Sequence, residues 1–212
     1  MGSSLTGILI ATGVVSWFAN RRSELKEFLL LHPYRIKHAQ EWHRLITHAF
    51  VHGDATHLLV NLFVLWQFGG EVERILNDVN SVPFIPMPGQ YTFTMLYFGG
   101  IAFATIPGLI RHADTPTYRS LGASGAVSAV LIFYILHHPM AQLYLFFLIP
   151  LPAFAAGILF FIYERQMDKR GGTGIAHDAH LWGGLFGLAF AALADRNVFL
   201  NFLESVWAYF ST

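Results

Sequence analysis

The stretch GASGAVSAVLIFYILHH, residues 122–138, decides the fold class of this chain. It contains no Asp, Glu, Lys or Arg, and a run of roughly 17 mostly apolar residues is about the shortest that crosses a bilayer as a helix. Its first half is rich in Gly, Ala and Ser, which let membrane helices approach one another closely. The stretch therefore predicts a packed transmembrane helix that carries a serine, Ser124, near its start.

The composition of the whole chain agrees with a membrane protein. Of its 212 residues, 54% are hydrophobic and only 12% are charged, which is unusual for a soluble domain. The 13 basic and 13 acidic residues cancel, so we expect no nucleic-acid partner. The chain has no cysteine, which excludes disulfides, thiolate zinc sites and cysteine nucleophiles.

Six segments approach or reach the length and apolarity of a membrane span. They predict an all-α fold: a polytopic membrane protein whose residues 1–212 form one domain, a six-transmembrane-helix bundle. Residues 21–52 are too apolar in places for a solvated loop, so we expect a long, membrane-associated first loop. No basic region precedes the first segment, which favours a retained helix over a signal peptide. The predicted spans are approximately 4–19, 56–76, 91–110, 122–138, 141–164 and 177–195.

Among the polar residues inside these spans, four matter most for function: His57, Asn61, Ser124 and His180. A polar side chain in hydrocarbon is costly unless it is paired, so such residues indicate function more often than in soluble proteins. Successive spans alternate in direction, so the second, fourth and sixth enter the membrane from the same side. All four residues lie near the entry ends of these spans, which predicts that they meet at a similar depth.

A serine and a histidine brought together in this way could form a nucleophile and its base. Asp178 lies about 200° around the helix from His180, and Asp195 lies some four turns away. We therefore expect a Ser124–His180 dyad without a carboxylate. Glycines that would allow the close helix contact flank both residues: Gly122, Gly125, Gly183, Gly184 and Gly187.

With these residues in place, the chain resembles the rhomboid family of intramembrane serine proteases. The motifs that carry the resemblance occur in the family's order between residues 42 and 187. They are Gly122-Ala123-Ser124-Gly125, Ala179-His180-Leu181-Trp182-Gly183, His57-Leu58-Leu59-Val60-Asn61, Gly69-Gly70-Glu71-Val72-Glu73, and Thr47-His48 followed by His52.

The resemblance implies an intramembrane serine endopeptidase that cleaves transmembrane segments of other membrane proteins. Ser124 would be the nucleophile and His180 the general base, while His57, Asn61 and the backbone N–H of Ser124 would stabilise the oxyanion. Gly122, Gly125 and Gly183 would serve substrate access and helix packing. The expected partners are transmembrane protein substrates and the lipid bilayer, and no cofactor or metal is expected.

Two positions depart from the family pattern. The Trp-Arg pair of the first loop is displaced here to Trp42-His43-Arg44. Many relatives carry an aromatic residue four positions after the nucleophile, where this chain has Ser128. Trp182, or a phenylalanine from another helix, would then have to pack on the imidazole of His180.

Two other functions fit parts of the sequence. The 11 histidines, among them His48-x-x-x-His52, His137-His138 and His177-x-x-His180, are compatible with a membrane metal-dependent oxidase. However, His137-His138 would lie at the opposite end of the bundle from the other two clusters. A relative that binds membrane helices without cutting them is the second alternative, and the intact Ser124 and His180 argue against it.

We expect a multi-pass protein of the bacterial inner membrane. Its orientation stays open, because two arguments conflict. The resemblance implies an N-terminus on the inner side, whereas Lys and Arg concentrate in the first, third and fifth loops, which the positive-inside rule would place in the cytoplasm.

Overall fold

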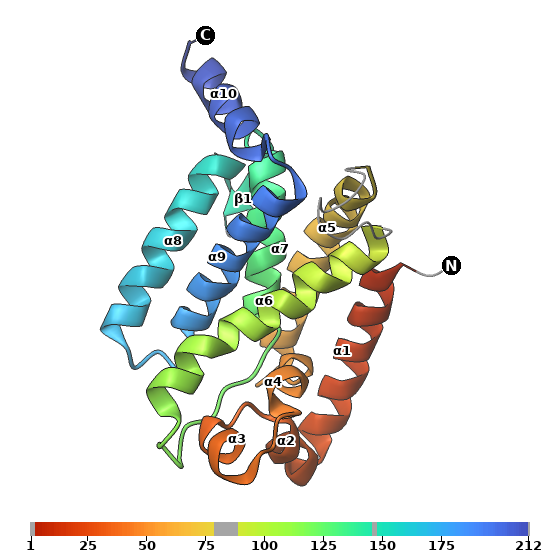
Figure 1. Cartoon of the computed structure of the whole chain (residues 1–212), viewed down its shortest axis with the longest axis vertical. Coiled ribbons are helices and arrows are strands. Elements are labelled where there is room, and N and C mark those ends of the chain that lie inside the picture. The colour runs from red at the N-terminus through yellow and green to blue at the C-terminus, as the bar shows by residue number, and fades with distance from the viewer. Residues whose placement is uncertain (1–2, 79–88, 146–147, 212) are drawn as a thin grey trace.

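The computed structural model describes residues 3–78, 89–145 and 148–211, and this part of the chain is mostly helical (Figure 1). The six longer helices that correspond to predicted spans enclose the core, and the short helices of the first loop gather at one end. The elements are α1 (Ser4–Arg21), α2 (Ser23–Leu29), α3 (Pro33–Ala39), α4 (Arg44–Thr47), η1 (His48–Phe50), α5 (Ala55–Asp78), α6 (Gly89–His112), α7 (Ser124–His137), β1 (Gln142–Leu145), β2 (Ile149–Pro152), α8 (Ala153–Arg170), α9 (His177–Ala194) and α10 (Val198–Ser211).

The quoted stretch forms α7, the centre of the fold. It packs against α5, α6, α8, α9 and α10, and ten of its 14 residues are buried. A helix that is apolar on all sides must be buried, which α7 achieves inside the ring of its neighbours. Ser124 is its first residue and lines the cavity described below.

Five of the six predicted spans coincide with helices, and the fifth, 141–164, is wrong in its first half. Within 141–164, β1 and β2 pair as an antiparallel hairpin with Leu143 opposite Leu151, and α8 begins only at Ala153. Pro150 and Pro152 explain the difference, because proline lacks the N–H that a helix interior requires. The structure also contains α10, which the sequence analysis did not predict.

The number of membrane spans is less clear than the number of helices. Among the described helices, only the Tyr91–His112 part of α6 is by itself long and apolar enough to cross a membrane. Two bent pairs would each add a span if counted as one: Arg44–Phe50 with Ala55–Asp78, bent by 96°, and His177–Ala194 with Val198–Ser211, bent by 105°. By this measure the described residues supply one to three spans, so the six-span count stays a prediction.

Arg44 anchors the first loop. Its side chain is fully buried, and its Nη1 donates to the carbonyl oxygens of Glu27, at 2.6 Å, and Leu30, at 2.8 Å. Its Nε donates to the Glu41 carboxylate, which balances the buried charge. The two residues of the displaced Trp-Arg pair therefore differ in burial. Arg44 lies inside the loop, whereas Trp42 is 60% exposed.

Glycines bring α7 and α9 into backbone contact. A Cβ atom added to Gly183 would lie 2.1 Å from the carbonyl oxygen of Gly125, and one added to Gly187 would lie 2.4 Å from that of Ala129. No real side chain tolerates such distances, so the two backbones can meet only because both positions lack a Cβ. Gly125 is in turn pressed against Ala104 of α6, which extends this contact to a third helix.

We predict that Gly183→Ala destabilises the protein by roughly 1–3 kcal/mol, because the added methyl group must push α9 away from α7. Thermal unfolding in detergent measures the effect. Gly13→Ala on α1 is the matched control, because a Cβ there would meet nothing within 4 Å. The control should be neutral or slightly stabilised, and equal stability of the two variants would contradict the backbone contact.

Candidate active site

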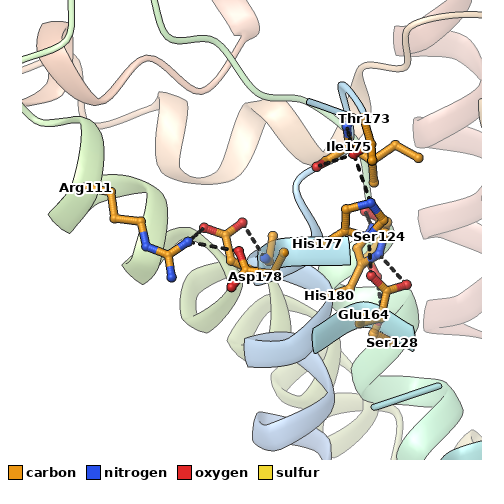
Figure 2. Close-up of polar contacts among 11 residues, drawn as sticks. Arg111, Ser124, Ser128, Glu164, Thr173, Ile175, His177, Asp178 and His180 are labelled. Atoms are coloured by element: carbon orange, nitrogen blue, oxygen red, sulfur yellow. Dashed lines mark hydrogen bonds and ion pairs between the residues drawn. The ribbon is translucent and has the colours of Figure 1, made fainter. Parts of the chain in front are cut away.

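Ser124 and His180 lie in direct contact (Figure 2). Ser124 begins α7, and His180 lies in the first turn of α9, where the Gly183 contact holds this helix against α7. The Oγ atom of Ser124 lies 2.8 Å from Nε2 of His180. This distance allows the hydroxyl to donate a hydrogen bond to the imidazole, which is the arrangement that a serine nucleophile and its base require.

The loop before Ser124 is held by hydrogen bonds to the segment that follows α4. The N–H of Gly122 donates to the carbonyl oxygen of His48 at 2.9 Å, and the N–H of Ala123 donates to Nε2 of His52 at 3.3 Å. Gly122 has a φ of +109°, a conformation that glycine adopts far more readily than other residues. The start of α7, and with it the position of Ser124, therefore depends on the first loop.

His52 supports this loop as a neutral imidazole. Ser16 Oγ donates to the carbonyl oxygen of Phe50 at 2.8 Å, so it accepts from Nδ1 of His52 at 2.9 Å, and Nε2 is left to accept from Ala123. Burial and the neighbouring His57 lower the pKa of His52 to about 4, against the opposite effect of Asp54. A second proton would have to occupy Nε2 and would break the bond to Ala123.

His57 and Asn61 of α5 line the same cavity of about 960 Å³ as Ser124 and His180. The ring of His57 lies against Gly122, where an added Cβ would come within 3.0 Å of Nε2. The Nδ2 atom of Asn61 donates to the carbonyl oxygen of His57 at 2.8 Å, which uses one of the two N–H groups of this amide. The structure thus brings all four residues singled out in the sequence to one cavity.

Glu164 of α8 is the site residue that sequence reasoning missed. Its Oε1 lies 3.0 Å from Nδ1 of His180, and its Oε2 lies 2.5 Å from Nδ1 of His177 (Figure 2). The carboxylate side chain is only 9% exposed. The expectation that no carboxylate reaches His180 is therefore wrong. The sequence offered one signal for it, because Glu164 is a carboxylate at the end of the predicted span 141–164.

Asp178 and Asp195, the two aspartates considered as partners of His180, do not pair with it in the described part of the chain. Asp178 accepts a hydrogen bond from Arg111 Nη1 at 3.0 Å, and the same nitrogen lies 3.0 Å from Asp168 (Figure 2). Arg111 thereby ties the end of α6 to α8 and α9 beside the site. Asp195 follows the last residue of α9, at the opposite end of the helix from His180.

The positions around the dyad differ from the family pattern as the sequence indicated. Ser128 donates to the carbonyl oxygen of Ser124 at 2.8 Å, which is a local bond within α7. The ring that lies edge-on to His180 is that of His177, with centroids 5.9 Å apart and planes at 79°. Trp182, which we considered for this contact, remains 36% exposed.

The histidine clusters considered for an oxidase do not gather into one common metal centre in the part of the chain that the structure describes. His138 pairs with Glu71, His137 bonds to the Phe133 carbonyl oxygen, and His48 bonds to that of Arg44. Within the described ranges, one group places three possible ligand atoms within 4.8 Å of one another: Glu164, His177 and His180. This group could hold a metal ion only through the imidazole that already contacts Ser124.

Comparison with known proteins gives one consistent family. Residues 39–197 match the model of the rhomboid domain. The chain is 33% identical over 156 residues to RHOMBOID-like protein 12, mitochondrial, of Arabidopsis thaliana, covering 66% of this chain and 43% of that protein. It is 28% identical over 156 residues to the human presenilin-associated rhomboid-like protein, mitochondrial, covering 72% of this chain and 38% of the relative. The chain thus spans only about two fifths of the length of the curated relatives it matches.

The neutral His52 predicts a pH-dependent stability. The unfolded chain binds a proton at His52 below a pH of about 6.5, whereas the folded protein does so only near 4, so stability is lost as the pH falls between these values. The loss attributable to His52 should reach about 3 kcal/mol. The unfolding temperature should therefore fall less between pH 7.5 and pH 4.5 for His52→Gln than for the unmodified protein. The buried His48 is present in both proteins, so equal falls would rule out this role of His52.

Proposed function

This chain belongs to the rhomboid family, and on that premise we propose that it is an intramembrane serine endopeptidase that uses Ser124 as nucleophile and His180 as general base. The observation that carries the proposal is the 2.8 Å contact between Ser124 Oγ and His180 Nε2, two residues that line the same cavity. An intact pair in this geometry favours an active protease over a relative that only binds membrane helices. The substrates would be transmembrane segments of other membrane proteins.

The reaction follows from the direction of this hydrogen bond. Nε2 of His180 takes the hydroxyl proton as Oγ of Ser124 attacks the scissile carbonyl carbon, which gives a tetrahedral intermediate. The protonated His180 then gives the proton to the leaving amine, and the C–N bond breaks to leave an acyl-serine. A water molecule, deprotonated by the same Nε2, hydrolyses this ester and restores Ser124.

Negative charge on the carbonyl oxygen needs hydrogen-bond donors. Ser124 is the first residue of α7, and the N–H groups of a helix's first turn have no partner within the helix, so its backbone N–H is one candidate donor. The second N–H of the Asn61 amide and the ring of His57 are the others, since both residues line the cavity. Such donors are most effective in a site with little bulk water.

The protein is integral to a membrane, as its family and composition require. We propose that α1, α5, α6, α7, α8 and α9 are the six spans. α7 is too short to cross alone, at about 21 Å for 14 residues, but it is enclosed by other helices and its polar start faces the cavity rather than lipid. A substrate helix would have to unwind locally before its carbonyl could meet Ser124, because its backbone bonds are internally satisfied.

The membrane itself is less defined than the fold. The relatives reported above are named as mitochondrial proteins, so they give no support to the predicted bacterial inner membrane. The sequence and the relatives agree on an integral membrane protein with transmembrane partners.

Ser124→Ala and His180→Ala should each reduce cleavage of a model transmembrane substrate to background, because the two residues act as a unit. Ser124→Ala should also abolish labelling by a fluorophosphonate. Ser205→Ala is the matched control, since it removes a serine hydroxyl that bonds to the carbonyl oxygen four residues earlier on α10. Cleavage that survives in purified Ser124→Ala protein would refute the proposal, and activity restored by metal after chelation would favour a metalloenzyme.

Asn61→Ala should lower kcat by about 10²–10³ with a smaller change in KM, because the oxyanion loses a donor. His57→Ala should act in the same direction and less strongly. Asn77→Ala is the control, because Asn77 makes the same side-chain bond to the carbonyl oxygen four residues earlier, at 2.9 Å, further along α5. If both asparagine variants unfold at a lower temperature but keep their turnover, Asn61 is only a structural residue of α5.

A further inference from the structure

The carboxylate of Glu164 lies against the catalytic imidazole on the side opposite Ser124 (Figure 2). We propose that Glu164 is a positioning residue of the active site and converts the Ser124–His180 dyad into a Ser–His–Glu triad. The inference rests on the proposed protease function and adds to it a third residue that the family motifs in this sequence do not include.

The three residues form one continuous chain of hydrogen bonds. Ser124 Oγ lies 2.8 Å from Nε2 of His180, and Nδ1 of the same ring lies 3.0 Å from Oε1 of Glu164. A neutral imidazole carries one proton, and Nε2 must be free of it to accept from the serine. An ionised carboxylate can only accept, so Glu164 selects the tautomer with the proton on Nδ1, which is the one that the base function needs.

Glu164 is itself held in place. Its second oxygen, Oε2, lies 2.5 Å from Nδ1 of His177, whose Nε2 lies 3.0 Å from the hydroxyl of Thr173. Both Glu164 and His177 are buried, so neither side chain is free to turn away into solvent. The carboxylate therefore presents Oε1 to His180 in a fixed direction, and its charge would also stabilise the imidazolium that forms when His180 takes the serine proton.

The packing of α8 on α9 explains how a side chain from another helix reaches this ring. His180 and Gly184 are four residues apart and share one face of α9, whereas Phe161 and Glu164 are three apart and share one face of α8. A Cβ added to Gly184 would lie 3.0 Å from the ring of Phe161. The small Gly184 thus lets α8 approach closely, one turn from the point where Glu164 meets His180.

A purely structural role is the alternative. Glu164 could serve only to clamp α8 to α9, as a buried ion pair or hydrogen bond often does. Glu71 of α5 offers a comparison outside the cavity, because its carboxylate lies 2.8 Å from Nε2 of His138, the residue that follows α7, and also accepts hydrogen bonds from Arg74 on its own helix. Glu71→Gln therefore removes a similar carboxylate–imidazole bond without touching His180.

The test compares Glu164→Gln, Glu164→Asp and Glu71→Gln by kcat, KM, fluorophosphonate labelling rate and thermal unfolding. All assays contain a chelator, so that a metal ion at Glu164, His177 and His180 cannot cause a difference. We expect Glu164→Gln to lower kcat and the labelling rate by about 10²–10⁴, the range of a general base, with KM changed by no more than a few fold. Glu164→Asp, which keeps the charge on a shorter side chain, should restore part of the loss. Glu71→Gln should lower only the unfolding temperature.

Equal kcat for Glu164→Gln and Glu71→Gln would overturn the triad. The proposed protease would then still stand, provided that Ser124→Ala abolishes cleavage, so the two failures are distinguishable. The ¹⁵N NMR spectrum of His180 gives a readout that remains useful if a variant is inactive. It should show the proton on Nδ1 in the unmodified protein and a redistribution toward Nε2 in Glu164→Gln, and an unchanged tautomer in that variant would also overturn the proposal.

Discussion

The candidate active site depends on the backbone contact between α7 and α9. Gly125 and Gly183 are in van der Waals contact without room for any side chain, and Ser124 and His180 lie on the same two helices within one turn of that contact. With a side chain at Gly183, the helices would have to separate and the 2.8 Å contact between hydroxyl and imidazole would open. The glycines that let α7 and α9 pack closely therefore also set the distance between the Ser124 hydroxyl and the His180 imidazole.

Several buried polar groups are paired between segments that lie far apart in the sequence. His52 joins α1 to the loop before Ser124 through Ser16 and Ala123, and Glu73 accepts from the backbone N–H of Ser4 at 2.9 Å. Glu164 joins α8 to α9 through His177 and His180. In an apolar bundle each such group would be costly alone, so each bond also fixes the relative position of two segments. The polar network thus supplies the orientation that apolar packing by itself does not specify.

The structure departs from the sequence-based expectations where local and long-range effects compete. Apolar content favoured a helix throughout 141–164, but Pro150 and Pro152 give a hairpin before α8. This change leaves the helix to begin at Ala153 and to extend to Arg170, so that Glu164 lies well inside it instead of at its end. Glu164, the last residue of the predicted span, is therefore a buried residue that contacts His180.

The sequence by itself determined the mostly helical membrane character and four of the residues that line the cavity: His57, Asn61, Ser124 and His180. These follow from apolar run length, small residues and alternating helix direction, all of which are local or nearly local properties of the chain. Only the tertiary structure decided which ring lies beside His180, which tautomer His52 adopts and that Glu164 reaches the site. The reason is physical: these contacts depend on the rotation and distance of α8 relative to α9 and of the first loop relative to α7, which are set by packing between segments far apart in the sequence.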